Sequence, residues 1–206
     1  MRNIIAMSAA ALLSTGAAHA ATTYTNFAPF QMDAGVLTVE GFEAAVWGSG
    51  NVNGTNVQGV TYDSTENLRV ISSFKRSGDN AVTSSDTSDN DNISAVFDVP
   101  VNAAGGFVSN VNVNDGDVIL SAFDAGGNLL ASVTAVDPGT FQFLGITSVT
   151  PIARVVFSHG LGIEGPDDFV LDEFYFGAAA SNPVPVPAAA LLFAPALAAF
   201  ARKRRT

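Results

Sequence analysis

Residues 117–136, which read DVILSAFDAGGNLLASVTAV, decide the fold. Two apolar runs in this stretch flank a cluster of Asp, Gly and Asn at positions 124–128. Short apolar runs bounded by turn-forming residues are typical of β-strands, and glycine tolerates the positive φ angles that tight turns require. The stretch therefore predicts two antiparallel strands joined by a hairpin turn at Asp124–Asn128.

The same pattern repeats through residues 21–182, with turn-forming clusters about every ten residues and no long segment of helical period. We expect strands at Leu68–Phe74, Ile93–Val101, Phe107–Val113, Asp117–Phe123, Leu129–Val136, Thr140–Ile146, Ile152–Ser158 and Asp168–Phe176. Short antiparallel strands without helices predict an all-β domain, an antiparallel β-sandwich of the jelly-roll type. Within it, Phe141 and Phe143 should share one face of their strand.

The composition supports one packed domain. Of the 206 residues, 48% are hydrophobic and only 14% are charged, which is unlike a disordered chain. There is no cysteine. A disulfide scaffold, a thiolate zinc site and a cysteine nucleophile are therefore excluded.

The charge of residues 21–182 is strongly negative, because this segment has all 19 acidic residues and only four basic ones, which gives a net charge of −15. The four are Arg69, Lys75, Arg76 and Arg154. Such a surface repels nucleic-acid phosphates, so no nucleic-acid partner is expected. It acts as a solubilising surface or as a surface for cations. Arg154 lies in an expected strand, where we expect it to pair with an acid across the sheet.

The N-terminus has the three parts of a secretory signal peptide. Arg2 gives a positive start, an apolar run extends to Leu13, and Ala18-His19-Ala20 forms a small-residue cleavage site. Residues 1–20 are therefore predicted to be removed before Ala21. This export would use the secretion translocon and signal peptidase.

The C-terminus, residues 183–206, has an equally distinctive order. Prolines at 183, 185 and 187 favour an extended spacer, and the apolar run 188–201 favours a helix of about 20 Å. That length is short of the roughly 30 Å hydrocarbon core of a bilayer. Basic residues stop translocation and stay on the cytoplasmic side, so a transmembrane helix is still predicted. The basic end comprises Arg202, Lys203, Arg204 and Arg205.

This ending resembles the PEP-CTERM sorting signals of Gram-negative bacteria, in their VPLPA variant. The matching motif is Val184, Pro185, Val186, Pro187 and Ala188. The chain departs from the variant at Val186, where Leu would stand. The resemblance implies transient anchoring in the inner membrane and cleavage by an exosortase-type membrane peptidase. The body would then reach the cell surface or the extracellular matrix, where exopolysaccharide is a possible partner.

A polar segment interrupts the strands at residues 75–92, and we expect a loop there. Its acids Asp86, Asp89 and Asp91 raise the question of calcium. An EF-hand loop that starts at Asp86 needs Gly at its sixth position and Glu at its twelfth. The chain has Asp91 and Phe97 at those positions. An EF-hand is therefore excluded.

The last expected strand carries acids among apolar residues. Strand alternation would place Asp172 on one face with Val170, Phe174 and Phe176. A carboxylate on an apolar face needs a cation or several hydrogen-bond donors. The alternative is an edge strand whose acids point to water.

Two short motifs resemble jelly-roll carbohydrate-binding modules: Leu171-Asp172-Glu173 in the last strand and Gly41-Phe42-Glu43 near the start. In such modules a structural calcium ion ties the first strand to the last. The resemblance therefore implies Glu43 and Asp172 as calcium ligands, with Glu40 as a weaker third.

No catalytic residues are predicted. The only histidine after the signal peptide is His159, which we expect where a strand ends and a turn begins at Gly160, and no G-x-S-x-G elbow accompanies it. Trp47 stacks on a sugar or packs in the core or at its rim. The first hypothesis is an exported surface or matrix protein that binds glycans weakly. The alternative is a secreted carbohydrate-active enzyme, a glycoside hydrolase or lyase, since a carboxylate pair among the 19 acids would suffice.

Overall fold

A computed structural model describes residues 21–44, 46–48, 50–85, 92–111, 116–160 and 169–178. The predicted signal peptide (1–20), the sorting signal (183–206) and the acids Asp86, Asp89 and Asp91 lie outside these ranges. Those predictions, and the domain boundaries that depend on them, therefore stay predictions. In the part described, no helix combines the length and the hydropathy needed to cross a membrane.

The described residues form strands that pair antiparallel throughout, together with one short helix. The elements are β1 (Ala21–Tyr24), α1 (Phe27–Ala34), β2 (Thr38–Glu40), β3 (Thr55–Val57), β4 (Val60–Asp63), β5 (Asn67–Ile71), β6 (Ala81–Ser85), β7 (Asn92–Asn110), β8 (Val118–Phe123), β9 (Leu129–Ala135), β10 (Gln142–His159) and β11 (Phe169–Gly177). The prediction of an all-β antiparallel sandwich is confirmed.

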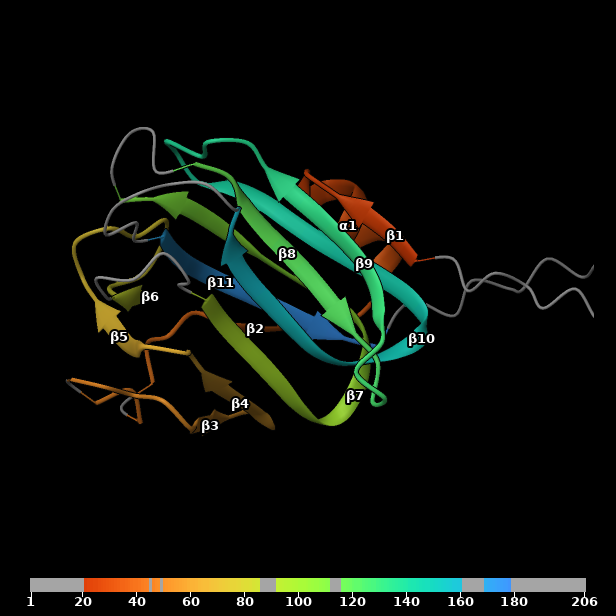
Figure 1. Cartoon of the computed structure of the whole chain (residues 1–206), viewed down its shortest axis with the longest axis horizontal. Helices are drawn as coiled ribbons and strands as arrows, with labels where there is room; N and C mark the ends of the chain where they lie inside the picture. The colour runs from red at the N-terminus through yellow and green to blue at the C-terminus, as the bar shows by residue number, and fades with distance from the viewer. Residues whose placement is uncertain are drawn as a thin grey trace, which may run out of the picture.

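Two long strands, β7 and β10, run through both layers of the sandwich (Figure 1). Each was expected as two separate strands, because Gly105-Gly106 and the segment around Pro151 resemble turns in the sequence. The structure keeps both segments in extended conformation, and register shifts between Thr147 and Arg154 bend the pair. Each half of β7 thus pairs with a different half of β10.

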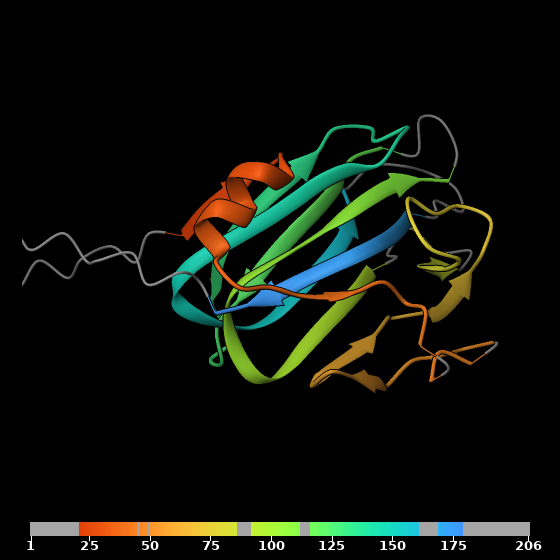
Figure 2. The same cartoon turned by 180° about the vertical axis from the view of Figure 1, so that it is seen from behind.

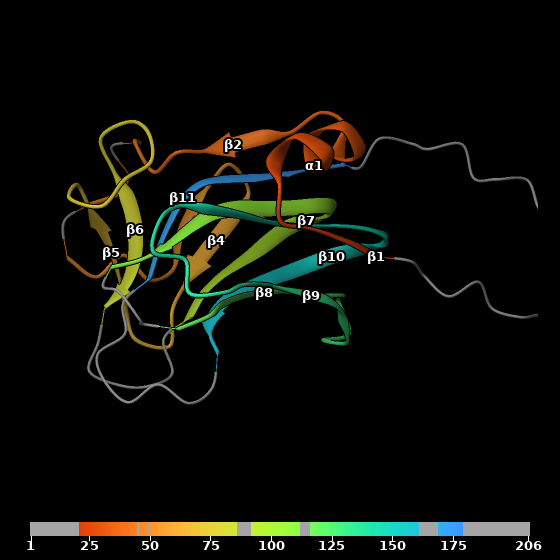
Figure 3. The same cartoon turned by 90° about the horizontal axis from the view of Figure 1, so that it is seen from above.

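Helix α1 packs on one of the two layers, which we call the covered layer, and we call the other the open layer. The covered layer has the order β5, β6, β11, second half of β7, first half of β10, β1, with β2 beside β11. The open layer has the order β3, β4, first half of β7, second half of β10, β8, β9. Helix α1 lies on the outer side of the covered layer, and β8 and β9 lie in the opposite layer (Figure 3).

Helix α1 and strand β6 correct the predicted arrangement. An eight-residue helix is too short to show a helical period, and α1 is stabilised by packing Phe30 and Ala34 against the sheet. Strand β6 lies inside the segment 75–92 that was expected to be a loop, because Val82 and Thr83 pair with β11. The polar composition of residues 75–92 hid this strand, although both strands that pair with it were predicted.

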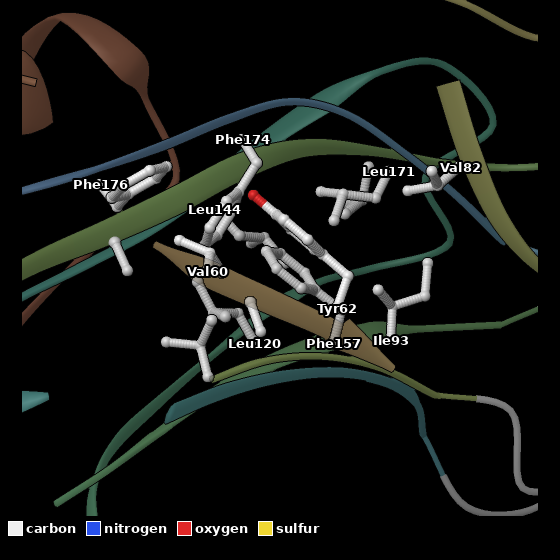
Figure 4. Packing of buried hydrophobic residues seen from close by; sticks show 14 of the residues in the cluster. Val60, Tyr62, Val82, Ile93, Leu120, Leu144, Phe157, Leu171, Phe174 and Phe176 are labelled. Atoms are coloured by element: carbon white, nitrogen blue, oxygen red, sulfur yellow. The ribbon is translucent and has the colours of Figure 1, made fainter. Parts of the chain in front are cut away.

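The main core lies between the layers (Figure 4). Its centre is aromatic, since the ring of Phe174 lies 5.9 Å from that of Tyr62 and 6.1 Å from that of Phe157, both edge-on. Figure 4 labels Val60, Tyr62, Val82, Ile93, Leu120, Leu144, Phe157, Leu171, Phe174 and Phe176. Burial of each such side chain stabilises the fold by about 1.5–3 kcal/mol.

Helix α1 lies against the outer face of the covered layer (Figure 2). A second cluster of buried side chains packs between this helix and the sheet. Phe30 of the helix contacts Phe143, with ring centroids 5.0 Å apart. Phe141 packs against the same cluster, so the prediction that it shares a face with Phe143 is confirmed. Gly105 and Gly145 face each other in register and leave room for these rings.

Gly105→Ala should destabilise the domain by about 1–3 kcal/mol, because the new Cβ would lie 2.6 Å from the carbonyl oxygen of Leu144 and 2.8 Å from the ring of Phe143. Urea unfolding measures the loss. Gly139→Ala is the matched control, since nothing lies within 4 Å of a Cβ added at this position. The stability of this variant should stay within about 0.5 kcal/mol of wild type. Equal stability of the two variants would contradict this packing.

The hairpin predicted at Asp124–Asn128 is confirmed. The backbone N–H of Asp124 donates to the carbonyl of Asn128 at 3.0 Å, and Gly127 has a φ of 79°. The Asp124 carboxylate accepts hydrogen bonds from the backbone of Gly126 and from both the backbone and side chain of Asn128. These donors favour the charged form and lower the pKa of Asp124, the Asn128 side chain most strongly.

Asn128→Ala should therefore raise the pKa of Asp124 toward its ordinary value, as measured by an NMR pH titration of the carboxyl carbon. A lowered folded pKa contributes stability above the unfolded value that is lost as the pH falls through the folded pKa. The hairpin of wild type should accordingly loosen at a lower pH than that of the variant. An unchanged pKa would show that the side-chain amide does not act on the carboxylate.

Candidate functional site

A β-bulge in β11 decides where Asp172 points. The pairing of β11 with β7 shifts register between Asp172 and Tyr175, and Glu173 has a φ of 49°. Before the bulge, Phe169 and Leu171 face the main core; after it, Phe174 and Phe176 do. The prediction that Asp172 shares a face with Phe174 and Phe176 is therefore wrong, because the extra residue reverses the alternation.

Asp172 is fully buried and bound by backbone N–H groups. One carboxylate oxygen, Oδ2, accepts from Arg76 N at 2.7 Å and Ser77 N at 3.0 Å, and Oδ1 accepts from Glu173 N at 2.7 Å. Burial raises the pKa of Asp172, while the N–H groups of Ser77 and Arg76 counteract that rise. The alternative in which this acid points to water is wrong.

Two more acids hold the same loop between β5 and β6. Glu173 accepts hydrogen bonds from the Arg76 guanidinium and from Ser77 Oγ, the latter at 2.9 Å. Glu43 accepts from the backbone N–H groups of residues 79 and 80 at 2.7 and 2.9 Å, and from the Asn80 amide at 3.2 Å. We call Glu43, Asp172 and Glu173 the carboxylate clasp.

Glu40 lies elsewhere, in a buried polar contact at the edge of the core. Its Oε1 accepts from Phe42 N at 2.6 Å and from the Trp47 indole at 3.3 Å, and its Oε2 accepts from the Gln58 amide at 3.2 Å. Trp47 is 7% exposed and packs edge-on against Tyr62. Trp47 is therefore a core residue, which leaves no indole face for a sugar.

The predicted calcium ligands thus split into two places. Glu43 and Asp172 approach one loop, and Glu40 joins Trp47 instead. Among the described residues, no three His, Cys, Asp or Glu side chains gather in a way that would hold a metal ion. Each carboxylate oxygen of the three acids accepts at least one N–H, so these residues do not fit the oxygen shell that calcium takes.

His159 lies at the end of a strand, as its position before Gly160 suggested, whereas Arg154 differs from its predicted role. His159 is the last residue of β10, and its ring lies edge-on to Phe169 at 5.1 Å. Arg154 is flanked in register by Val96 and Phe123, neither of which is acidic. Its guanidinium lies over the Phe123 ring, 4.7 Å from the centroid. The prediction of a cross-strand acid is therefore wrong.

The outer face of the open layer is the candidate binding surface. Inward residues of its strands, such as Leu120, Ala122 and Val155, belong to the main core, so their neighbours point outward. Arg154 and Phe123 form a stacked pair on that face, beside the Ser121 and Ser132 hydroxyls, which are 2.9 Å apart. Helix α1 contacts the other layer, which leaves this face without a helix in the described part of the chain.

A groove of about 500 Å³ adjoins this face at the end of the sandwich. Leu129, the register partner of Phe123, lines it together with the bend of β10, and Leu129 and Val149 are largely exposed. Its lining comprises Asp124, Leu129, Leu130, Val149, Thr150 and Pro151. The groove combines apolar walls with one carboxylate.

The enzyme alternative gains no support from the two grooves that the structure describes. Glycoside hydrolysis needs two carboxyl groups about 5–9.5 Å apart across the scissile bond. The groove beside Leu129 contains only Asp124, and a second groove of about 330 Å³ contains only Asp98. Each of these two grooves therefore offers one carboxylate where the reaction needs two.

Sequence reasoning missed the Phe123–Arg154 pair. The neighbours at two-residue spacing are Ser121 and Ala125 for Phe123, and Ile152 and Val156 for Arg154, so neither pattern marks an outward surface. Only the cross-strand register brings the two side chains together.

The chain matches no protein-family model and no curated protein. Solved structures similar to it include carbohydrate-binding modules, the class that its two short motifs resemble. One is TmCBM61, solved in complex with β-1,4-galactotriose, with 18% identity, a TM-score of 0.43 and coverage of 59% of this chain and 89% of that one. Another is the CBM22-1–CBM22-2 tandem domain of Paenibacillus barcinonensis Xyn10C, with 18% identity, a TM-score of 0.46 and coverage of 73% and 49%.

The K2 cleaved adhesin domain of Lys-gingipain is also similar, with 13% identity, a TM-score of 0.47 and coverage of 68% of this chain and 99% of that one. Identities and TM-scores this low carry no argument for a shared ligand.

Proposed function

We propose that this protein is an exported, non-catalytic glycan-binding protein. The observation that supports this most directly is the Phe123–Arg154 pair on the outer face of the open layer. A half-buried aromatic ring beside an exposed cation on a sheet face suits binding, and the described grooves lack the paired carboxylates that hydrolysis needs.

The chemistry of the pair suits a sugar. A guanidinium has five N–H donors in a fixed plane, and sugar hydroxyl and ring oxygens accept such bonds. Stacking on Phe123 holds the Arg154 plane in place, which lowers the entropy lost on binding. The Ser121 and Ser132 hydroxyls add adaptable donors and acceptors, and the apolar wall at Leu129 suits the C–H face of a pyranose. Few groups contribute, so the affinity should be modest.

Arg154→Gln should weaken glycan binding about tenfold, because a hydrogen bond to a charged group contributes about 1.5–3 kcal/mol and 1.4 kcal/mol corresponds to tenfold. Phe123→Ala should weaken it similarly, because the ring that holds the Arg154 guanidinium in place is lost. Affinity electrophoresis in gels containing xylan, galactan, β-glucan or alginate measures the retardation. Phe74→Ala is the matched control, because Phe74 is 44% exposed on the β5–β6 loop and lies outside this face. Its binding should equal that of wild type.

Two results would overturn the proposal. Wild-type protein that none of the four polymers retards is not a glycan binder of this kind. Equal weakening by Phe74→Ala would show that any exposed ring suffices and that the open layer has no special role.

We also propose that the chain is exported and sorted through its two ends. The support is the sequence alone: a signal peptide at residues 1–20, and the Val184–Ala188 motif, apolar run and basic end that resemble substrates of an exosortase-type peptidase. Until cleavage, the tail would hold the body at the inner membrane. The body would then meet exopolysaccharide outside the cell.

Mass spectrometry of the native protein from envelope and medium fractions tests this sorting. We expect a mature chain that begins at Ala21 and ends between about residues 183 and 187. A variant with Arg202, Lys203, Arg204 and Arg205 changed to Asn is the control, and it should escape cleavage because translocation no longer stops. An intact tail in the mature wild-type protein would defeat the proposal.

A further inference from the structure

We infer that the carboxylate clasp ties the segment after β2 and strand β11 to the β5–β6 loop without a metal ion, in the place where the resemblance to carbohydrate-binding modules implies calcium. The inference is independent of the proposed glycan binding. Its basis is that N–H groups donate to the carboxylates of the clasp, and that these carboxylates join separate parts of the chain.

The three carboxylates of the clasp accept hydrogen bonds from N–H and O–H groups of the β5–β6 loop, and Asp172 also accepts one from the backbone N–H of Glu173. In the two acids expected to bind calcium, Oδ2 of Asp172 and Oε1 of Glu43 each accept two backbone N–H bonds, and their other oxygens accept one bond each. The hydrogen atoms carry partial positive charge at the positions where a cation would have to sit. A calcium ion takes 6–8 oxygen ligands, so it would have to displace most of these donors.

The loop is shaped to bring its backbone onto the acids. Gly78 has a φ of 60°, a conformation that favours glycine, and a Cβ at this position would overlap the Glu43 carboxylate. Residues 76 and 77 donate to β11 on one side of this glycine, and residues 79 and 80 donate to Glu43 on the other. The loop therefore offers two pairs of successive N–H groups, each matched to one carboxylate.

The clasp joins three parts of the chain that are distant in sequence. Glu43 follows β2, Asp172 and Glu173 belong to β11, and the loop follows β5. A calcium ion between Glu43 and Asp172 would join the first two parts, and the loop joins the same two through hydrogen bonds. Arg76 completes the contact, because its guanidinium pairs with Glu173 and lies over the Phe107 ring, 3.7 Å from the centroid.

The charge balance is consistent with a metal-free clasp. Asp172 is fully buried, and a buried carboxylate without partners would be very costly. Three backbone N–H groups supply that partnership, and the Arg76 side chain supplies a positive charge to the adjacent Glu173. The acid therefore has the donors that make a cation unnecessary.

Thermal melting of the full chain, prepared with 5 equivalents or more of EDTA and separately with millimolar CaCl2, tests the inference. We expect midpoints that agree within about 1 °C, because an ion bound only by the folded state would raise the midpoint. Glu43→Ala and Asp172→Asn should each lower the midpoint by about 3 °C or more in both buffers. Asp79→Asn is the matched control, and its midpoint should stay close to that of wild type. It removes one charge from the same loop, but the Asp79 side chain is 91% exposed and the backbone N–H of residue 79 remains.

Hydrogen exchange measured by NMR keeps the test decisive if a variant fails to fold. In wild type with EDTA, the amides of residues 76, 77, 79 and 80 should exchange at least tenfold more slowly than the unbonded loop amide of residue 78 in the same sample. A midpoint that rises with calcium and falls with EDTA, together with loop amides that are protected only when calcium is present, would overturn the inference.

Discussion

The pairing of β7 with β10 across both layers is the constraint on which the rest of the structure depends. A single antiparallel pair spans the sandwich, and the register shift near Thr147 turns it from the covered layer into the open layer. Every other strand is linked to this pair by strand pairing, either directly or through one or two intervening strands. The positions of α1, the clasp and the Phe123–Arg154 pair all follow from this arrangement.

Glycine gives that pair its shape. Gly105 and Gly145 face each other where α1 packs, and side chains there would collide with the backbone of β10 or with the rings under the helix. Gly106 faces the opposite side, where a Cβ would lie 2.6 Å from Leu171. The same residues that resemble a turn in the sequence therefore allow a continuous strand to be covered closely on both faces.

Much of the fold was predictable from the sequence, because alternating apolar residues and the Asp124–Asn128 turn are local signals. Strand β6 and helix α1 were not, since their stability comes from partners far away in the chain: Val82 pairs with β11 and Phe30 packs on Phe143. The bulge at Glu173 was equally hidden. A single inserted residue reverses the face of Asp172, and nothing in residues 168–177 marks where the insertion falls.

The site was predicted less well than the fold for a related reason. The strand pattern singled out Asp172 as an acid in need of partners, and the resemblance to carbohydrate-binding modules added Glu43 and implied a calcium ion. In the structure, both carboxylates accept hydrogen bonds from backbone N–H groups within residues 76–80. Every residue except proline has a backbone N–H, so residue types do not show which N–H groups will approach a carboxylate. The Phe123–Arg154 contact depends on register between β8 and β10, which alternation within a single strand does not specify.

The placement of the chain ends has a consequence for how the domain meets its surroundings. Strand β1 begins and β11 ends at one end of the sandwich, and the β5–β6 loop lies at the other (Figure 1). A body tethered by its last residues would carry that loop as its distal tip. The hydrogen bonds of the clasp would then decide how rigidly this tip is held while the tail keeps the body at the inner membrane.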